Sequence, residues 1–548
     1  MKKSAQLFLG LLCLAPLSLT SCGGGTTPEE DGVTTLDMFL NGGNSFDGLK
    51  RDSIWKKIEE DTGVKMAIRG ATHNSDYYTT LNPMINTGSI PDVIFAVPNN
   101  AGNSYNNWVD QEIIWNIDEL LAEKPGEYPY IEAILGSDQF KNLTFGNNAH
   151  TLLPYLSSES GWGIYYRADW LINIGYYTET NGVKTAKTPE TIEEFQDVLM
   201  KFTLNDPDGD GKNNTYGISP FGKAFYMNPL YHAFGVTPDY DLDRNNKGEY
   251  MFLTPEFKNF LTWAQDMYAK GYIDPQFAVN NNEQDRDKFY SGTTGILITN
   301  AEMHVSWIAN SFENANGKGK LILGKAPIGT KNLGVEGAGG FSSWGGYWGG
   351  FSISKLCKNP HAAMRLFNYL YSPEGSKLRS YGIKDQHYSI DDEGNYIPNL
   401  ERRNEEPTGT FYQTKNEDGD SMPTGYYKMG TGVFGSDIDW DSALHFKVRR
   451  DPNGLDANYK DLIEQGLKNN TVVRSRLYNV TGYYSSYTNK MKKVEDASNI
   501  FAINAIMGKK NLTTDWDALM NQVNQSSYDY KNIQRMLEEL AKKAGIIQ

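Results

Sequence analysis

One loop of the sequence has the residue spacing of a calcium-binding site. Residues 205–218 read NDPDGDGKNNTYGI, in which alternating aspartates precede a glycine that permits a sharp turn. Calcium binds about six to eight hard oxygen atoms, and alternating acids around such a turn present their oxygens to one point. The donors that this spacing predicts are the carboxylates of Asp206, Asp208 and Asp210, the carbonyl of Lys212 and the side chain of Asn214.

The same loop departs from a calcium-sensing hand. Its twelfth position is Gly217, where an EF-hand has a bidentate Glu, and no second loop of this kind occurs in the sequence. A sensor needs a paired hand, so we expect calcium to act as a structural clip. The alternative is an Asp- and Asn-rich surface turn that binds no metal.

A second group of candidates lies in the segment GVEGAGGFSSWGGYWGGFSIS, residues 334–354. Its eight glycines do not build a core, which predicts that Trp344, Tyr347 and Trp348 are held on a loop, exposed to a ligand. Aromatic faces suit the apolar face of a sugar ring, so these rings indicate a carbohydrate site. Trp162 and Trp307 are weaker candidates of the same kind. The alternative is a packed aromatic corner.

The sequence lacks the common catalytic patterns. Its seven His residues include no HExxH pair, and it has no G-x-S-x-G nucleophile motif. The stretch GKLILGKA (319–326) resembles a phosphate-binding loop, but Ala326 replaces the Ser or Thr that binds magnesium. A carboxylate pair that hydrolyses glycosidic bonds has no fixed spacing in sequence and stays open. We predict a binding protein that is not an enzyme.

The N-terminus has the pattern of an exported lipoprotein. Lys2 and Lys3 precede a short apolar run, and LTSC follows it at 19–22. A short apolar run with these flanks is typical of an export signal rather than of a membrane span. We predict a signal peptide at 1–21, then a lipid on Cys22 and a flexible linker within 22–34, which would hold the protein on the extracytoplasmic face of the cell membrane.

The charge balance argues against one class of partner. The chain has 548 residues, with 52 Lys and Arg against 67 Asp and Glu, a formal net charge of −15. Affinity for nucleic acid comes mainly from basic side chains that neutralise phosphates, so we expect no nucleic-acid partner. The length suffices for two or more lobes, each with its own core.

The elements that must position the candidate residues begin with alternating strands and helices. Buried strands are predicted at 34–40, 64–70 and 91–97, with helices between them. This alternation indicates a parallel α/β sheet, in which ligands bind beyond the carboxyl ends of the strands. The loops after the first and third strands are therefore candidate ligand loops, which contain Asn44 and Asn99.

Further elements surround the Asp-rich loop. Thr191 and Glu194 form a capping box, which predicts a helix that runs directly into the loop. A buried strand is predicted at 293–300, a helix is predicted to begin at Asn359 and Pro360, and residues 515–544 are predicted to be amphipathic helix.

Taken together, several stretches resemble the extracellular solute-binding proteins (family 1) of ABC sugar importers, and most of all the long branch with alginate- and oligosaccharide-binding members. The resemblance covers nearly the whole mature chain. The segments that carry it are YYRADWLINIGY, TPETIEEFQDVLMKFTLNDPDGDGKNNTYGI, SISKLCKNPHAAMRLFNYLYSPEG, YGIKDQHYSIDDEGNYIP and IMGKKNLTTDWDALMNQV. In that branch the Asp-rich stretch is a calcium loop, and an acid often stands at the position of Thr215.

The resemblance implies an α/β fold of two lobes, the periplasmic-binding-protein type II arrangement, with a hinge and with each lobe discontinuous in sequence. We expect the first lobe to comprise 35–155 plus 296–355, and the second lobe, with the calcium loop, to comprise 156–295 plus 356–548. It also implies a monomer that binds a carbohydrate, an oligosaccharide in that branch, and delivers it to an ABC permease. We expect Glu302 and Asn99 to bond the sugar hydroxyls.

Two other classes stay open at this point. One is a SusD-like glycan-binding lipoprotein of the outer membrane, which is nearly all helical and is disfavoured by the predicted strands of the first 100 residues. The other is a secreted glycoside hydrolase, which turnover of an oligosaccharide would reveal.

Overall fold

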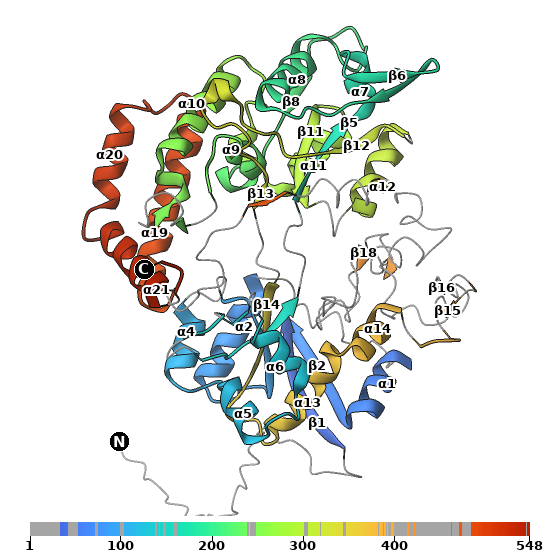
Figure 1. The fold of residues 1–548 in the computed structure, drawn as a ribbon, viewed down its shortest axis with the longest axis vertical. Helices are drawn as coiled ribbons and strands as arrows, with labels where there is room; N and C mark the ends of the chain where they lie inside the picture. The colour runs from blue at the N-terminus through green and yellow to red at the C-terminus, as the bar shows by residue number, and fades with distance from the viewer. Residues whose placement is uncertain are drawn as a thin grey trace, which may run out of the picture.

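The computed structural model describes most of the chain in three blocks. These are 33–98 (except 42–52 and 72–74), 103–381 and 484–547 (except 544), together with short pieces between 383 and 473. Within the second block the gaps are 138–139, 142, 146–148, 157–161, 238–239, 242–247, 301–304, 318 and 343–346. The described residues form two lobes, which Figure 1 shows one above the other.

The first lobe is built on a five-stranded sheet, the lower one in Figure 1. Its strands, in spatial order, are β2 (Val64–Ala71), β1 (Thr34–Asn41), β3 (Val93–Ala96), β14 (Tyr347–Ile353) and β4 (Leu153–Leu156). β1 pairs in parallel with β2 and β3, whereas β14 runs antiparallel to β3 and β4. The predicted strands at 34–40, 64–70 and 91–97 are therefore confirmed.

β14 enters this sheet from far along the chain. A Cβ atom on Gly349 would lie 2.6 Å from the carbonyl oxygen of Ala96, and one on Gly350 would clash with the carbonyl of Leu153. Glycine at both positions lets the neighbouring strands approach closely. The expectation that Tyr347 and Trp348 lie on a glycine-rich loop is wrong. The backbone of both residues belongs to the start of strand β14.

The second lobe has a four-stranded sheet. Its spatial order is β12 (Leu321–Gly324), β5 (Trp162–Arg167), β11 (Thr294–Asn300) and β8 (Tyr216–Ile218). β5 is antiparallel to both of its neighbours, and β11 is parallel to β8. The strand predicted at 293–300 is confirmed as β11.

The pairing differs from the expected lobe boundaries. Because β11 and β12 pair through β5, residues 296–324 belong to the second sheet and not to the first. Helices α13 (Pro360–Tyr371) and α14 (Pro373–Tyr381) pack into the core of the first lobe, although we expected 356–548 in the second. Hydrophobic periodicity marks an element but does not identify its partner, which explains both differences.

Helices cover both sheets, and each lobe has its own hydrophobic core. Besides α13 and α14, the first lobe contains α1 (Ser53–Thr62), α2 (Ser75–Asn86), α4 (Asn103–Asp110), α5 (Ile117–Glu123) and α6 (Pro129–Leu135). The second contains α7 (Ala168–Asn173), α8 (Ile192–Leu204), α9 (Asn228–His232), α10 (Pro255–Ala269), α11 (Asn282–Tyr290) and α12 (Val305–Asn316). None of the helices in the described part of the chain is long and apolar enough to cross a membrane.

Three C-terminal helices complete the core of the second lobe, drawn in red in Figure 1. They are α19 (Tyr484–Ile506), α20 (Thr514–Val523) and α21 (Tyr530–Lys543). The helix predicted over 515–544 is thus two helices, separated near Asp529, whose φ of 61° interrupts helical geometry.

Short elements fill the remaining connections. They are the pairs β6 (Tyr177–Thr180) with β7 (Val183–Ala186), β9 (Tyr240–Asp241) with β10 (Glu249–Tyr250), β13 (Phe341–Ser342) with β19 (Val472–Val473), β15 (Tyr388–Ile390) with β16 (Tyr396–Pro398), β17 (Thr414–Lys415) with β18 (Ser421–Met422), and the 3-10 turns η2 (Ala224–Met227), η3 (Met251–Leu253), η4 (Phe277–Val279) and η5 (Lys331–Leu333).

A buried histidine fixes the point where the chain leaves the second lobe. Nδ1 of His232 donates to the carbonyl of Val236 at 2.5 Å, so Nε2 accepts from the Ser342 hydroxyl at 2.9 Å. The backbone N–H of Ser342 also donates to Oδ1 of Asn228 at 3.0 Å. The first lobe resumes at Tyr347, only five residues after Ser342.

Burial lowers the pKa of His232 to about 4 from its usual value near 6.5. Below pH 6.5 the unfolded chain takes up a proton that the folded protein refuses until about pH 4, so stability falls across this window. His232→Gln should remove on the order of 2–3 kcal/mol of that loss between pH 7 and pH 4.5. Urea unfolding of both proteins at several pH values measures it, and equal pH slopes would contradict the prediction.

Candidate ligand site and candidate calcium site

The Asp-rich loop connects α8 to β8. The capping box of Thr191 and Glu194 is present at the start of α8, and the helix buries its apolar side before it ends at Leu204. The loop then curls, because Asp206, Gly209 and Gly211 have φ values of 47°, 72° and 76°. This conformation turns alternate side chains toward one another.

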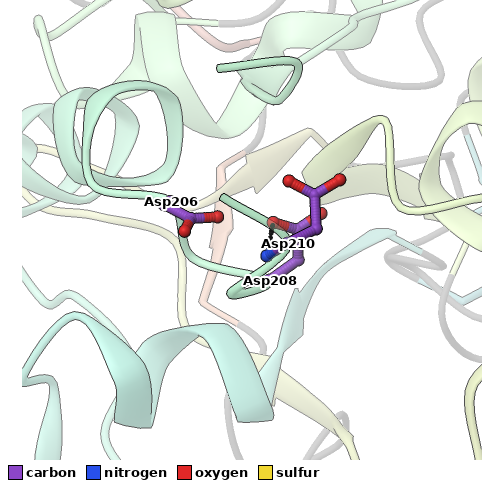
Figure 2. Close-up of side chains that lie close together, drawn as sticks. All are labelled: Asp206, Asp208 and Asp210. Carbon is purple, nitrogen blue, oxygen red and sulfur yellow. Dashed lines mark hydrogen bonds between the residues drawn. The ribbon is translucent and has the colours of Figure 1, made fainter. Parts of the chain in front are cut away.

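The three aspartates converge as the spacing predicts (Figure 2). One carboxylate oxygen from each of Asp206, Asp208 and Asp210 lies within 4.8 Å of the others. Oδ2 of Asp206 accepts from the backbone N–H of Gly211 at 3.1 Å. Its Oδ1 atom is buried and has no hydrogen-bond partner among the described residues. This oxygen is therefore available to coordinate a cation.

The other two acids have different surroundings. The pKa of Asp208 is raised, first by partial burial and then by its hydrogen bond with Asp206 and the negative charge of Asp210. The pKa of Asp210 is lowered, chiefly by its hydrogen bonds with Lys212. Nζ of Lys212 and Nδ2 of Asn214 both donate to Asp210, at 3.1 and 3.2 Å. A cation would relieve the crowding of negative charge, so the residues present fit calcium.

The end of the loop explains why the twelfth position is glycine. A Cβ atom on Gly217 would lie 2.5 Å from Cδ2 of Leu199, so a bidentate Glu has no room there. The hydroxyl of Thr215 is buried and donates to the carbonyl of Phe202 at 2.8 Å. Both positions are committed to packing on α8, and neither contributes an oxygen to the acidic cluster.

Beyond β8 the chain forms a group of aromatic side chains that our sequence reasoning missed. We call residues 219–227 the aromatic loop, since they contain Phe221, Phe225 and Tyr226, all partly exposed. The rings of Phe221 and Tyr226 lie 4.0 Å apart between centroids, and those of Phe225 and Tyr226 lie 5.8 Å apart. Three rings within one turn directly after a short strand were the signal that could have identified them.

Trp162 supports the aromatic loop from behind. Its ring contacts Phe225 and Tyr226 edge-on, at centroid distances of 5.8 and 5.5 Å, and only 2% of the residue is exposed. A direct contact between Trp162 and a ligand stays a prediction, because in this structure the other two rings cover it.

The aromatic loop lies on the edge of the second lobe that is connected to the first. Trp162 pairs with Asn300 at the carboxyl end of β11, and β8 runs parallel to β11 and ends where Ile218 pairs with Ile296. Trp162 is six positions after Leu156 of the first sheet, which limits the distance between them to about 20 Å. Ligands of open α/β sheets bind at carboxyl ends of this kind.

Most of the other predicted sugar contacts cannot be placed as side chains. Trp307 lies in α12, and Tyr347 and Trp348 lie in β14, where the structure describes only their backbone. Four candidates lie outside the described residues, as does the predicted lipid anchor: Trp344, Asn44, Asn99, Glu302 and Cys22.

Two bacterial proteins are similar to this chain in sequence. Lipoprotein LipO of Bacillus subtilis is 24% identical over 415 residues, which cover 74% of this chain and 76% of LipO. The polygalacturonan/rhamnogalacturonan-binding protein YtcQ of the same organism is 24% identical over 349 residues, which cover 62% of this chain and 64% of YtcQ.

Solved structures show the same fold. A solute-binding protein of Bifidobacterium longum infantis, associated with an HMO-binding ABC transporter, matches with a TM-score of 0.61 and 16% identity, over 93% of this chain and 99% of that one. The alginate-binding protein AlgQ2, solved without calcium ion, matches with a TM-score of 0.61 and 15% identity, over 93% of this chain and 98% of that one.

The match to a family model covers more than half of the sequence. The model describes a bacterial extracellular solute-binding protein and matches residues 47–377, which include the second sheet, the strands of the first sheet except β1, the Asp-rich loop and the aromatic loop. The two discontinuous α/β lobes agree with it and do not fit a nearly all-helical protein. The chain therefore belongs to the bacterial extracellular solute-binding proteins.

Proposed function

We propose that this protein captures a carbohydrate, specifically an oligosaccharide, outside the cytoplasmic membrane and delivers it to the permease of an ABC importer. The observation that carries the proposal is the group of partly exposed rings in the aromatic loop. This loop lies at the edge of the second lobe where the chain passes between the two lobes. Ring faces of this kind stack on sugars. The name of YtcQ supports a polysaccharide fragment as ligand.

In this proposal the two lobes share the ligand. The second lobe contributes Phe225 and Tyr226, and the first contributes residues near the carboxyl ends of its strands, with Asn44, Asn99, Trp344 and Trp348 as the predicted contacts. Glu302 and Trp307 would add contacts from the second lobe. Closure of two lobes around a ligand requires contacts that exist only in the closed state.

Removal of a stacking ring should weaken sugar binding. A thermal-shift screen against oligogalacturonides, rhamnogalacturonan fragments and neutral oligosaccharides would first identify a ligand. Tyr226→Ala and Trp348→Ala should then each raise its Kd about thirtyfold, since truncation of a buried aromatic anchor commonly costs about 2 kcal/mol. Isothermal titration calorimetry measures the change.

Tyr177→Ala is the matched control for this experiment. Tyr177 lies on the β6–β7 hairpin, where the ammonium of Lys184 lies 4.4 Å from the centroid of its ring, and its removal should leave the Kd unchanged. If the Tyr226 and Trp348 variants both bind like the parent, the site lies elsewhere. Recovery of cleaved rather than intact oligosaccharide would favour the glycoside hydrolase alternative.

We further propose that the Asp-rich loop binds one calcium ion as a structural clip. Asp206, Asp208 and Asp210 would hold it, with the Lys212 carbonyl and the Asn214 side chain, and water would complete the shell because Gly217 and Thr215 offer no oxygen. The name of AlgQ2 "without calcium ion" supports calcium binding among similar folds.

Calcium should raise the melting temperature and leave sugar affinity nearly unchanged. A ligand that binds only the folded state at a hundredfold excess over its Kd stabilises that state by about 2.7 kcal/mol. Asp208→Ala should abolish the effect, whereas Asp197→Asn, which neutralises a half-buried carboxylate on α8 outside the Asp-rich loop, should keep it. A melting temperature that responds to neither calcium nor chelator would rule out the site.

We also propose that a lipid on Cys22 tethers the protein, which the lipoprotein name of LipO supports. Cys22→Ala should move the protein from the membrane fraction to the soluble fraction or the medium, because no acyl chain can then be attached. Immunoblots of fractionated cells measure the distribution. An unchanged membrane fraction would contradict the anchor.

A further inference from the structure

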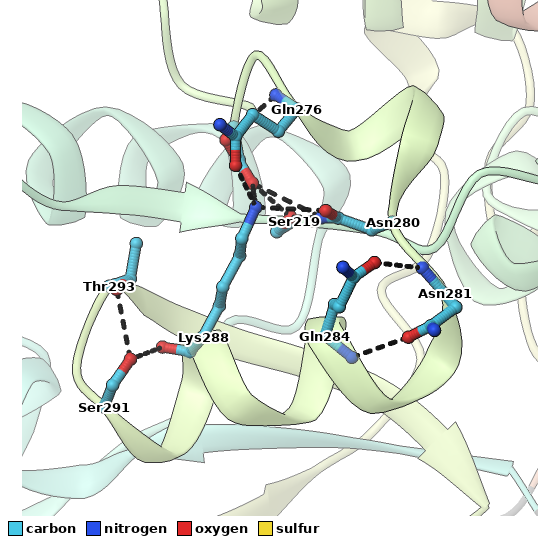
Figure 3. Close-up of polar contacts among 9 residues, drawn as sticks. Ser219, Gln276, Asn280, Asn281, Gln284, Lys288, Ser291 and Thr293 are labelled. Carbon is cyan, nitrogen blue, oxygen red and sulfur yellow. Dashed lines mark hydrogen bonds and ion pairs between the residues drawn. The ribbon is translucent and has the colours of Figure 1, made fainter.

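A partly buried polar network joins the start of the aromatic loop to residues 274–280 and to α11; Figure 3 shows Ser219, Gln276, Asn280 and Lys288 of this network. Its centre is the carboxylate of Asp274, only 3% exposed, which accepts from the Ser219 hydroxyl at 2.6 Å and from Nζ of Lys288 at 2.5 Å. Lys288 also donates to Oε1 of Gln276 at 3.0 Å and to Oδ1 of Asn280 at 3.1 Å. An ammonium has three N–H donors, and here each has an acceptor.

The network is attached to the aromatic loop at two points. Ser219 is the first residue of that loop, and its hydroxyl also accepts from Nδ2 of Asn280 at 2.7 Å. The backbone N–H of Gly222 donates to the carbonyl of Asn280 at 3.3 Å. A Cβ atom on Gly222 would lie 2.6 Å from the carbonyl of Ala278, so the loop rests closely on residues 274–280.

Charge is balanced within the network. Burial opposes ionisation of Asp274, but hydrogen bonds from Lys288, Ser219 and the backbone of Gln276 outweigh it and lower its pKa. A second acid on α11, Asp285, is also buried, and burial raises its pKa well above the usual range, which favours its neutral form. Lys288 forms its ion pair with Asp274, at 2.5 Å.

We propose that Lys288 is a positioning residue for ligand binding, which holds Ser219 and Asn280 through Asp274 and thereby fixes where Phe221, Phe225 and Tyr226 stand. The proposal rests on the proposed function of this loop in sugar recognition. A buried ion pair gives little net stability compared with apolar packing, but its directed bonds define one geometry. The hydrogen bonds of Lys288 go to Asp274, Gln276 and Asn280, so its effect on the three rings is indirect, through Ser219 and Gly222 of the loop.

The experiment first measures the loop without any ligand. Hydrogen–deuterium exchange by mass spectrometry should show faster exchange of the peptide that spans 219–227 in Lys288→Met than in the parent. Lys201→Met is the matched control, because it removes a partly exposed ammonium that pairs with Asp197 on α8 of the same lobe, and its loop exchange should equal that of the parent. Unchanged exchange in Lys288→Met would overturn the proposal.

The second measurement is the affinity for the oligosaccharide found in the screen, which Lys288→Met should weaken about tenfold, as expected when contact groups lose their fixed positions. Faster exchange with unchanged affinity would also overturn a positioning role. If the parent binds no oligosaccharide at all while the exchange result holds, the proposed function fails and not the loop support.

A double variant keeps the test valid if Lys288→Met does not fold. Asp274→Asn with Lys288→Met removes both charges of the ion pair, so it should fold, yet it lacks the ammonium that joins the three acceptors. Its loop should still exchange faster and its affinity should still fall. A double variant that matches the parent in both measurements would overturn the proposal.

Discussion

The first lobe depends on a steric constraint at the centre of its sheet. β14 fits between β3 and β4 only because Gly349 and Gly350 have no side chains to collide with the carbonyls of Ala96 and Leu153. Once β14 is in place, the strand ties the end of the second lobe, at Ser342, to the middle of the first sheet within a few residues. The placement of Tyr347 and Trp348 at the start of that strand follows from the same constraint.

Features set by neighbouring residues could be predicted from the sequence, and features set by distant ones could not. The capping box of α8, the curl of the Asp-rich loop and the convergence of Asp206, Asp208 and Asp210 involve groups a few residues apart. The lobe membership of 296–324 depends on pairing with β5, more than 100 residues earlier. The aromatic loop could not be predicted for the same reason. The partial exposure of its rings depends on contacts with Trp162 and with residues 274–280, which are distant in the sequence.

β8 separates the two candidate sites of the second lobe. The Asp-rich loop precedes this strand and the aromatic loop follows it, at a separation of three strand residues, about 10 Å. Thr215 and Gly217 attach the strand to α8 through hydrogen bonds with Phe202 and Thr203. In the proposed function, calcium would thus reinforce an edge that is already fixed to a helix, and it would add stability there without changing the proposed ligand-facing side.

The C-terminal helices determine when the second lobe can become stable. Val494, Leu519 and Leu537 belong to the same apolar core as Phe195 of α8, so that core is incomplete until almost the whole chain is available. A polypeptide emerges from the ribosome N-terminus first, and domains fold as units during synthesis. The apolar core of the second lobe can therefore close only after α19, α20 and α21 have been synthesised.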